Sequence, residues 1–312
     1  MSARGWSLFI AVSLIWGIPY LLIKLALNGG MTPATLAEGR IVLAAALLLA
    51  VAARRGTLPA LRGRLAWIAL FGLVEIAAPF LLIAAGESRA PSSLAAIVIA
   101  TVPLITAVLT LQLAGEEQVG ALRFAGMLVG FAGVVALVGL EAASGGATLA
   151  ACGLFLLASC GYAIGPIVIS RRLRGQDATA TMGASLAVAG VLLAPLALLD
   201  LPPRTPSAGA LAAVAVLGVL CTAVAFVLMA LLVFEAGPTR STIVTYVNPL
   251  VAVLLGVLFL DERLTPGAAS GLVLILAGSW LATLARRSPA RAASDPAPSS
   301  DDAGAGTRRA ER

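Results

Sequence analysis

The chain has 312 residues, of which 60% are hydrophobic and only 12% are charged, and its formal net charge is +6. A soluble domain carries about 25% charged residues, so this composition excludes a water-soluble globular fold, and no Lys/Arg cluster indicates nucleic-acid binding. The chain has no His, and its three Cys lie in apolar runs without C-x-x-C spacing. We therefore expect no metal site and no cofactor.

Ten segments approach the roughly 20 apolar residues that a helix needs to cross a bilayer. The segments are apolar on all sides and about twice as long as the strands of a β-barrel. We therefore predict an all-α membrane protein with ten transmembrane helices. The predicted spans are 6–27, 33–53, 65–86, 92–114, 121–140, 149–170, 178–199, 209–233, 239–260 and 266–285.

The first predicted span carries Trp16, Tyr20 and Lys24 at intervals of four residues. This spacing places the three side chains on one helix face. Two aromatic rings and a cation are suited to a cavity wall that stacks on a ring and binds a carboxylate. The alternative is an interfacial aromatic residue beside a Lys that reaches toward the headgroups.

The second predicted span carries Glu38 and Arg40 in its outer third. Residues two apart on a helix do not face each other, so each is expected to pair with another helix. One option pairs Lys24 with Glu38, which would form a possible outer gate together with Arg40. The alternative is a purely structural pair.

The third predicted span carries Glu75 at its midpoint. A carboxylate near the centre of the bilayer is costly unless it faces the bundle interior, finds a partner or is protonated. Because the chain has no His, Glu75 is the best candidate for proton coupling or for recognition of a cationic group. The alternative is a structural carboxylate that is hydrogen-bonded to a neighbouring helix.

Pro103 and Pro249 are predicted to interrupt the fourth and ninth helices, because proline removes a backbone hydrogen bond. Such breaks lie near the binding site in inverted-repeat transporters. Thr101, Tyr246 and Asn248 flank these helix kinks and offer hydrogen bonds there. The alternative is that both prolines serve packing alone.

The distribution of Lys and Arg predicts the orientation of the chain. With a cytoplasmic N-terminus, ten basic residues before the tail fall on the cytoplasmic side and three on the outer side, as the positive-inside rule requires. Large apolar residues vanish after Ser288, so we expect 288–312 to be a disordered cytoplasmic tail. Both termini are then cytoplasmic, and the protein is expected in the cell (inner) membrane.

The two halves of the chain match each other at an offset of 146 residues. Pro103 and Pro249 are each followed thirteen residues later by Glu, and the same offset pairs Gly72 with Gly218. Such periodic matches indicate an internal repeat.

The repeat unit contains five predicted helices, in 6–140 and in 149–285. Because five is odd, two units in series enter the membrane from opposite sides. The sequence therefore predicts two inverted repeats, an architecture typical of secondary transporters, with the substrate near the midplane between them.

Trp16-Gly17 is followed by Lys24 in the first predicted span and by Arg40 in the second, and the segments Pro103…Gly115-Glu116 and Pro249…Asp261-Glu262 form a pair. In these residues the chain resembles the EamA-type family of the drug/metabolite transporter superfamily, over residues 6–285. The resemblance implies a carrier of small metabolites, amino acids or drugs, often outward, and no enzyme.

We therefore expect a secondary transporter that exports small metabolites by alternating access. Coupling of this transport to protons is one option. The expected partners are the lipid bilayer and a small-molecule substrate; the substrate, the coupling ion and the oligomeric state stay open. The alternative is a membrane scaffold or sensor without transport activity. An intramembrane enzyme would need a catalytic dyad or metal cluster at depth, which the sequence lacks. The expected substrate-binding or coupling residues are Glu75, Trp16, Tyr20, Tyr246, Asn248 and Thr101.

Overall fold

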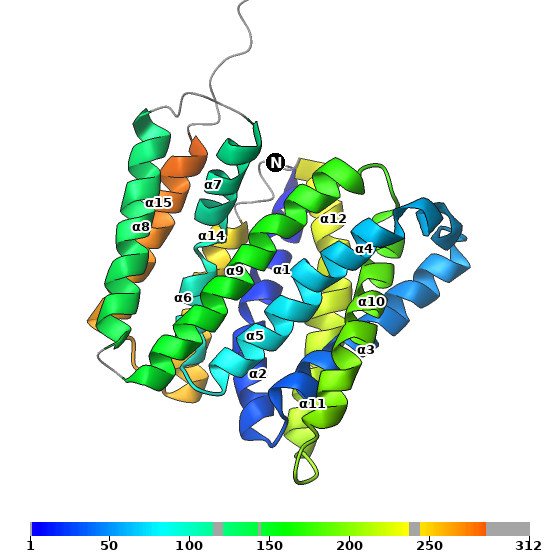
Figure 1. Ribbon diagram of the computed structural model, residues 1–312, viewed down its shortest axis with the longest axis horizontal. Helices are drawn as coiled ribbons and strands as arrows, with labels where there is room; N and C mark the ends of the chain where they lie inside the picture. The colour runs from blue at the N-terminus through cyan, green and yellow to red at the C-terminus, as the bar shows by residue number, and fades with distance from the viewer. Residues whose placement is uncertain (1, 115–120, 143–144, 237–243, 285–312) are drawn as a thin grey trace, which may run out of the picture.

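The computed structural model describes residues 2–114, 121–142, 145–236 and 244–284, and these residues form helices with no strand among them (Figure 1). The predicted tail, 288–312, lies outside the described residues. The helices are α1 Ala3–Gly17, α2 Pro19–Asn28, α3 Pro33–Arg54, η1 Leu58–Arg64, α4 Leu65–Phe71, η2 Gly72–Ala77, α5 Ala78–Glu87, α6 Ser92–Ile99, α7 Val102–Ala114, α8 Ala121–Ala142, α9 Gly146–Arg172, α10 Ala178–Leu199, α11 Ala208–Gly218, η3 Val219–Val224, α12 Ala225–Ala236, α14 Val244–Leu260 and α15 Pro266–Leu284.

The outer surface of the bundle is apolar, as a lipid environment requires. Large side chains such as Val191 and Leu199 are 75% and 86% exposed. Within the described chain, seven helical stretches are long and apolar enough to cross a membrane, and three shorter apolar helices accompany them. The structure therefore confirms a multi-pass α-helical membrane protein, since so much exposed apolar surface would aggregate in water.

Short polar residues and prolines define where several helices begin. The side chains of Asp177, Ser207 and Thr265 each accept a hydrogen bond from the backbone N–H three residues further on, which satisfies an N–H group that has no partner within the helix. Pro33 and Pro266 occupy first helical positions, where the missing N–H costs nothing. These local signals explain why the helix starts lie close to the predicted boundaries.

Two helix pairs form the flanks of the bundle. In Figure 1, α8 and α15 lie side by side at one end, and α3 and α10 lie together at the other. The α8–α15 contact depends on glycine, because a Cβ added to Gly126 would lie 2.8 Å from the carbonyl oxygen of Gly278. Small residues of this kind let membrane helices approach closely.

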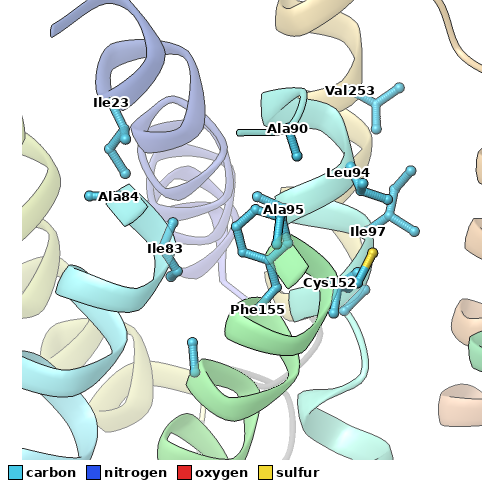
Figure 2. Close-up of a cluster of buried hydrophobic side chains, with 14 of the residues drawn as sticks. Ile23, Ile83, Ala84, Ala90, Leu94, Ala95, Ile97, Cys152, Phe155 and Val253 are labelled. Atoms are coloured by element: carbon cyan, nitrogen blue, oxygen red, sulfur yellow. The ribbon is translucent and has the colours of Figure 1, made fainter. Parts of the chain in front are cut away.

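The largest buried apolar cluster surrounds Phe155 of α9. Figure 2 shows its ring among Ile83 of α5, Leu94 and Ala95 of α6, and neighbouring side chains. Gly86 of α5 leaves room for this ring, since a Cβ there would overlap it. The cluster joins the first half of the chain to the second through α9.

Four of the predicted spans are not continuous α-helices. The first divides at Ile18, before Pro19, and the fourth divides between α6 and α7, before Pro103. The third and eighth contain the π-helical segments η2 and η3. Such segments are rare, and are frequent at functional sites.

At Pro249 the helix is not divided, because α14 runs from Val244 to Leu260 with the proline inside it, and the kink expected there stays a prediction. The neighbouring side chain explains how this part of the helix is held. The Asn248 amide nitrogen, oriented toward the Val244 and Ser13 carbonyl oxygens, donates to them at 2.9 and 3.1 Å. This bridge ties α14 to α1 at the level of the proline.

Candidate functional site

A buried arginine joins the two halves of the chain. Arg40 of α3 is 6% exposed, and its Nη2 donates a hydrogen bond of 3.0 Å to the Thr222 hydroxyl of η3. Its guanidinium carbon lies 3.8 Å from the centroid of the Phe80 ring. A desolvated cation–π contact of this kind contributes about 2 kcal/mol or more, so Arg40 is held from two sides.

The guanidinium of Arg40 also interacts electrostatically with the phenol groups of Tyr20 and Tyr162. Tyr162 interacts in turn with the carboxyl group of Glu75. We call Tyr20, Arg40, Glu75, Tyr162 and Thr222 the central polar cluster. Its members come from α2, α3, η2, α9 and η3, so both halves of the chain contribute to it.

Glu75 lies in the π-helical segment η2 and faces α9 of the second half. Its carboxyl group lies directly against Gly165, where the Cβ of any other residue would overlap it. The Oε2 atom is sealed from solvent and has no hydrogen-bond partner among the described residues. An unpaired carboxylate is costly to bury, so this position favours either the neutral acid or a ligand that supplies a donor.

The two π-helical segments occupy corresponding positions in the two halves, since η3 begins at residue 219 and η2 at residue 72, a separation of 147. Gly72 begins η2, and Gly218 directly precedes η3. Each of these glycines touches the backbone of a neighbouring helix. A Cβ on Gly218 would lie 2.9 Å from the Arg40 carbonyl oxygen, and one on Gly72 would lie 2.5 Å from that of Ser185. The Thr222 hydroxyl donates back to the Leu217 carbonyl at 2.8 Å.

Several residues predicted for the cavity wall lie outside the central polar cluster. Trp16 stacks edge-to-face on Phe226, with ring centroids 6.1 Å apart. The Tyr246 hydroxyl donates to the Ser279 carbonyl at 3.1 Å. Thr101 is 1% exposed and donates to the Val98 carbonyl at 2.7 Å, which closes the turn between α6 and α7. Of the predicted cavity residues, Tyr20 and Glu75 share the central polar cluster.

The predicted gate residues do not form one cluster. Lys24 donates from Nζ to the backbone carbonyls of Glu87 and Ala90, at 2.6 and 2.9 Å. Glu38 instead faces α10, with Oε1 3.5 Å from the Cβ position of Gly190. Lys24 therefore clasps the turn between α5 and α6, while Arg40 lies in the central polar cluster.

A surface pocket of about 390 Å³ lies beside this clasp. It is lined by Lys24 and Asn28 of α2, by the link after α5 and by Glu262 after α14. The Glu262 carboxylate accepts the backbone N–H groups of Ser92 and Ser93, at 2.6 and 2.9 Å. It therefore caps α6 of the first half from the second half.

Sequence reasoning missed three residues that the structure brings forward. The repeat pairs Glu75 with Cys221, 146 residues later, and Thr222 is the next residue. The offset could therefore have pointed to Thr222. Glu87 directly follows the predicted end of the third span at residue 86, and Tyr162 lies in the sixth span without a polar neighbour to mark it. In the part of the chain that the structure describes, no three His, Cys, Asp or Glu residues are grouped to hold a metal ion.

The helical bundle, its apolar surface and its polar cluster define a multi-pass membrane protein with polar groups in its interior. The model of the EamA-like transporter family matches the chain twice, over residues 3–139 and 149–284. The chain belongs to the EamA-like transporter family, so the resemblance found in the sequence is confirmed.

Individual relatives agree with this family. The chain is 33% identical to "Uncharacterized inner membrane transporter YedA" of Escherichia coli (strain K12) over 250 residues, which are 79% of each protein. It is 27% identical over 288 residues to a WAT1-related chloroplastic protein of Arabidopsis thaliana, covering 86% of this chain and 68% of that one. A crystal structure that is 22% identical covers 92% of this chain and 100% of its own, with a TM-score of 0.65, and shares the fold.

Proposed function

We propose that this protein is a secondary transporter of the inner membrane that exports small metabolites by alternating access, with Glu75 as its coupling carboxylate. The observation that carries the proposal is the position of Glu75. It is a partly buried acid whose Oε2 atom is sealed from solvent without a hydrogen-bond partner among the described residues, placed in a π-helical segment against α9. A titratable group buried between two halves of a transporter is suited to carry a proton.

We further propose that residues 6–140 and 149–285 are two five-helix repeats of inverted topology, with both termini in the cytoplasm. The helix contacts support a two-fold relation, because α5 packs on α9 and α12 packs on α1, which are corresponding pairs under exchange of the halves. The π-helical segments and the flanking pairs α3–α10 and α8–α15 also obey this exchange. Alternating access then requires rearrangement of one half against the other.

The central polar cluster is the proposed substrate and coupling site. Arg40 has an Nε atom without a hydrogen-bond partner among the described residues, and Tyr20 and Tyr162 lie within its electrostatic range. Aromatic walls with a few polar groups are typical of small-molecule sites. A substrate-binding role is also proposed for four residues outside this cluster, in a conformation in which the helices around α1 and α14 have moved. These residues are Trp16, Thr101, Tyr246 and Asn248.

The test is transport in proteoliposomes with a panel of small metabolites and an imposed pH gradient. We expect the wild type to move at least one metabolite at a rate that depends on the gradient. The Glu75→Gln variant keeps the shape of the side chain but cannot release a proton, so its residual transport should not respond to the gradient.

The matched control is Glu235→Gln, which removes an exposed carboxylate at the end of α12. It should transport like the wild type. An unchanged gradient dependence in Glu75→Gln would remove Glu75 as the coupling site. Catalytic turnover of a panel compound without any gradient would argue against a transporter.

A further inference from the structure

A further acid, Glu87, lies at the end of α5, within electrostatic range of Tyr20 and Arg40 of the central polar cluster. Its side chain is 0% exposed. Neither of its carboxyl oxygens has a hydrogen-bond partner among the described residues. Its neighbours Ile83, Ala84 and Ala90 belong to the apolar cluster of Figure 2. A carboxylate in such surroundings is stable as the neutral acid or as the partner of a cation.

A cation is close to Glu87 but is used differently. Lys24 donates to the backbone carbonyl of Glu87 at 2.6 Å and to that of Ala90 at 2.9 Å, and not to the carboxyl group. The ammonium group therefore holds the α5–α6 turn while the acid beside it is unpaired. This arrangement is stable only while Glu87 is neutral, because an ionised carboxylate would draw the ammonium group to itself.

The charged and titratable groups that face Glu87 come from every neighbouring element. Lys24 and Tyr20 face it from α2, Arg40 from α3, and Glu262 from the link after α14. Two positive charges and one negative charge therefore lie within reach of the Glu87 carboxyl group. Glu262 also caps α6 just beyond the turn, so Glu87 lies where α2, α5, α6 and the second half meet.

We propose that Glu87 is a second proton-binding site and that loss of its proton releases the clasp of Lys24 on the α5–α6 turn. With Glu87 protonated, Lys24 holds the two backbone carbonyls and the turn is closed. When Glu87 loses its proton to water, Lys24 forms an ion pair with the carboxylate, the two carbonyls lose their donor and the pocket beside them opens. The physiological meaning of this switch rests on the proposed transport function.

The test measures the opening without any substrate. In a Cys160→Ser background, Ala90→Cys places a thiol at a position that is 4% exposed beside the clasp. The labelling of this thiol by a maleimide is measured in nanodiscs. It is divided by the labelling of Ser88→Cys, an exposed neighbour in the same link. The ratio removes the ordinary pH dependence of thiol reactivity, which both positions share. We expect the ratio of Ala90→Cys to Ser88→Cys labelling to rise severalfold from acidic to alkaline buffer.

Glu87→Gln should hold this ratio at its acidic value throughout, and Lys24→Met should hold it high at every pH. Glu235→Gln is the matched control and should behave like the parent. An equal rise with pH in Glu87→Gln, or no rise in the parent, would overturn the proposal. Infrared difference spectra provide an independent check, since the parent should lose a neutral carboxyl band on alkalinisation that Glu87→Gln lacks.

The outcome can be separated from that of the transport experiment. The labelling experiment needs no substrate, so a pH-dependent clasp can be found even where no panel compound is moved. Conversely, transport with a pH-independent labelling ratio would leave the proposed function intact and remove only the switch.

Discussion

At the scale of single residues, the protein places acids where lipid would make them costly, and their carboxyl groups are held in two different ways. Glu262 is satisfied by two backbone N–H groups at the start of α6. Glu75 and Glu87 have carboxyl oxygens without a partner among the described residues. A fully satisfied acid stabilises the fold, whereas an unsatisfied buried acid is suited to exchange a proton or bind a ligand. This difference separates the structural carboxylate from the two functional candidates.

We predict that Glu262→Ala destabilises the protein and that Glu262→Gln does so less. The Ala variant leaves the first N–H groups of α6 without an acceptor, which costs about 1–2 kcal/mol. The Gln variant keeps one acceptor oxygen but loses the charge that favours a helix N-terminus. Thermal unfolding of the purified protein in detergent would measure both effects. A midpoint equal to that of wild type in Glu262→Ala would contradict the cap, and Glu235→Ala is the control.

At the scale of elements, glycine decides how closely helices approach. The pair α8–α15 is held at Gly126, Gly133 and Gly278, where an added Cβ would meet the backbone or a packed side chain of the other helix. Gly139, on the same helix α8, has open space around it. The two kinds of glycine look alike in the sequence, and only the contact distinguishes them.

We predict opposite effects for the same substitution at two positions of α8. Gly126→Ala should destabilise the protein by about 1–3 kcal/mol, because the new methyl group would force α8 and α15 apart. Gly139→Ala should be neutral or stabilising by up to about 1 kcal/mol, because alanine favours a helix over glycine. Thermal unfolding of the two variants in parallel tests the contact. Equal shifts in the same direction would show that Gly126 is not limiting the approach.

At the scale of the whole molecule, polar contacts lie where the two halves of the chain meet. Arg40 reaches Thr222, Glu75 faces Gly165, and Glu262 caps α6. A rearrangement of one half against the other therefore alters the surroundings of each acid. This coupling between helix packing and buried charge is what an alternating-access mechanism needs.

We predict that Arg62→Cys and Arg174→Cys label from the same side of the membrane and that Arg204→Cys labels from the opposite side. The three arginines are exposed, in links of the two halves. The proposed inverted repeats place the first two in the cytoplasm. Labelling by an impermeant maleimide in oriented membrane vesicles, in a Cys160→Ser background, is the measurement. If positions 62 and 174 faced opposite sides, the inverted topology would be wrong.

Much of the fold could be predicted because it depends on local rules. The helix ranges follow from runs of apolar residues bounded by Pro, Gly and short polar caps, and α10 matches its predicted span of 178–199. Glu75 could be singled out because a charge at the middle of such a run is costly anywhere in a bilayer. The π-helical segments were not predicted from the apolar runs; the structure places them beside Gly72 and Gly218, which meet neighbouring backbones.

The sequence alone therefore determined that this protein lies in lipid, where its helices run and to which family it belongs. The reason is that hydropathy and short motifs are properties of consecutive residues. Only the tertiary structure decided which buried polar groups meet. It paired Arg40 with Thr222, sent Lys24 to two backbone carbonyls and left Glu87 unpaired. The physical reason is that a side chain's partners are chosen by the packing of distant helices, and that packing depends on contacts which no local pattern records.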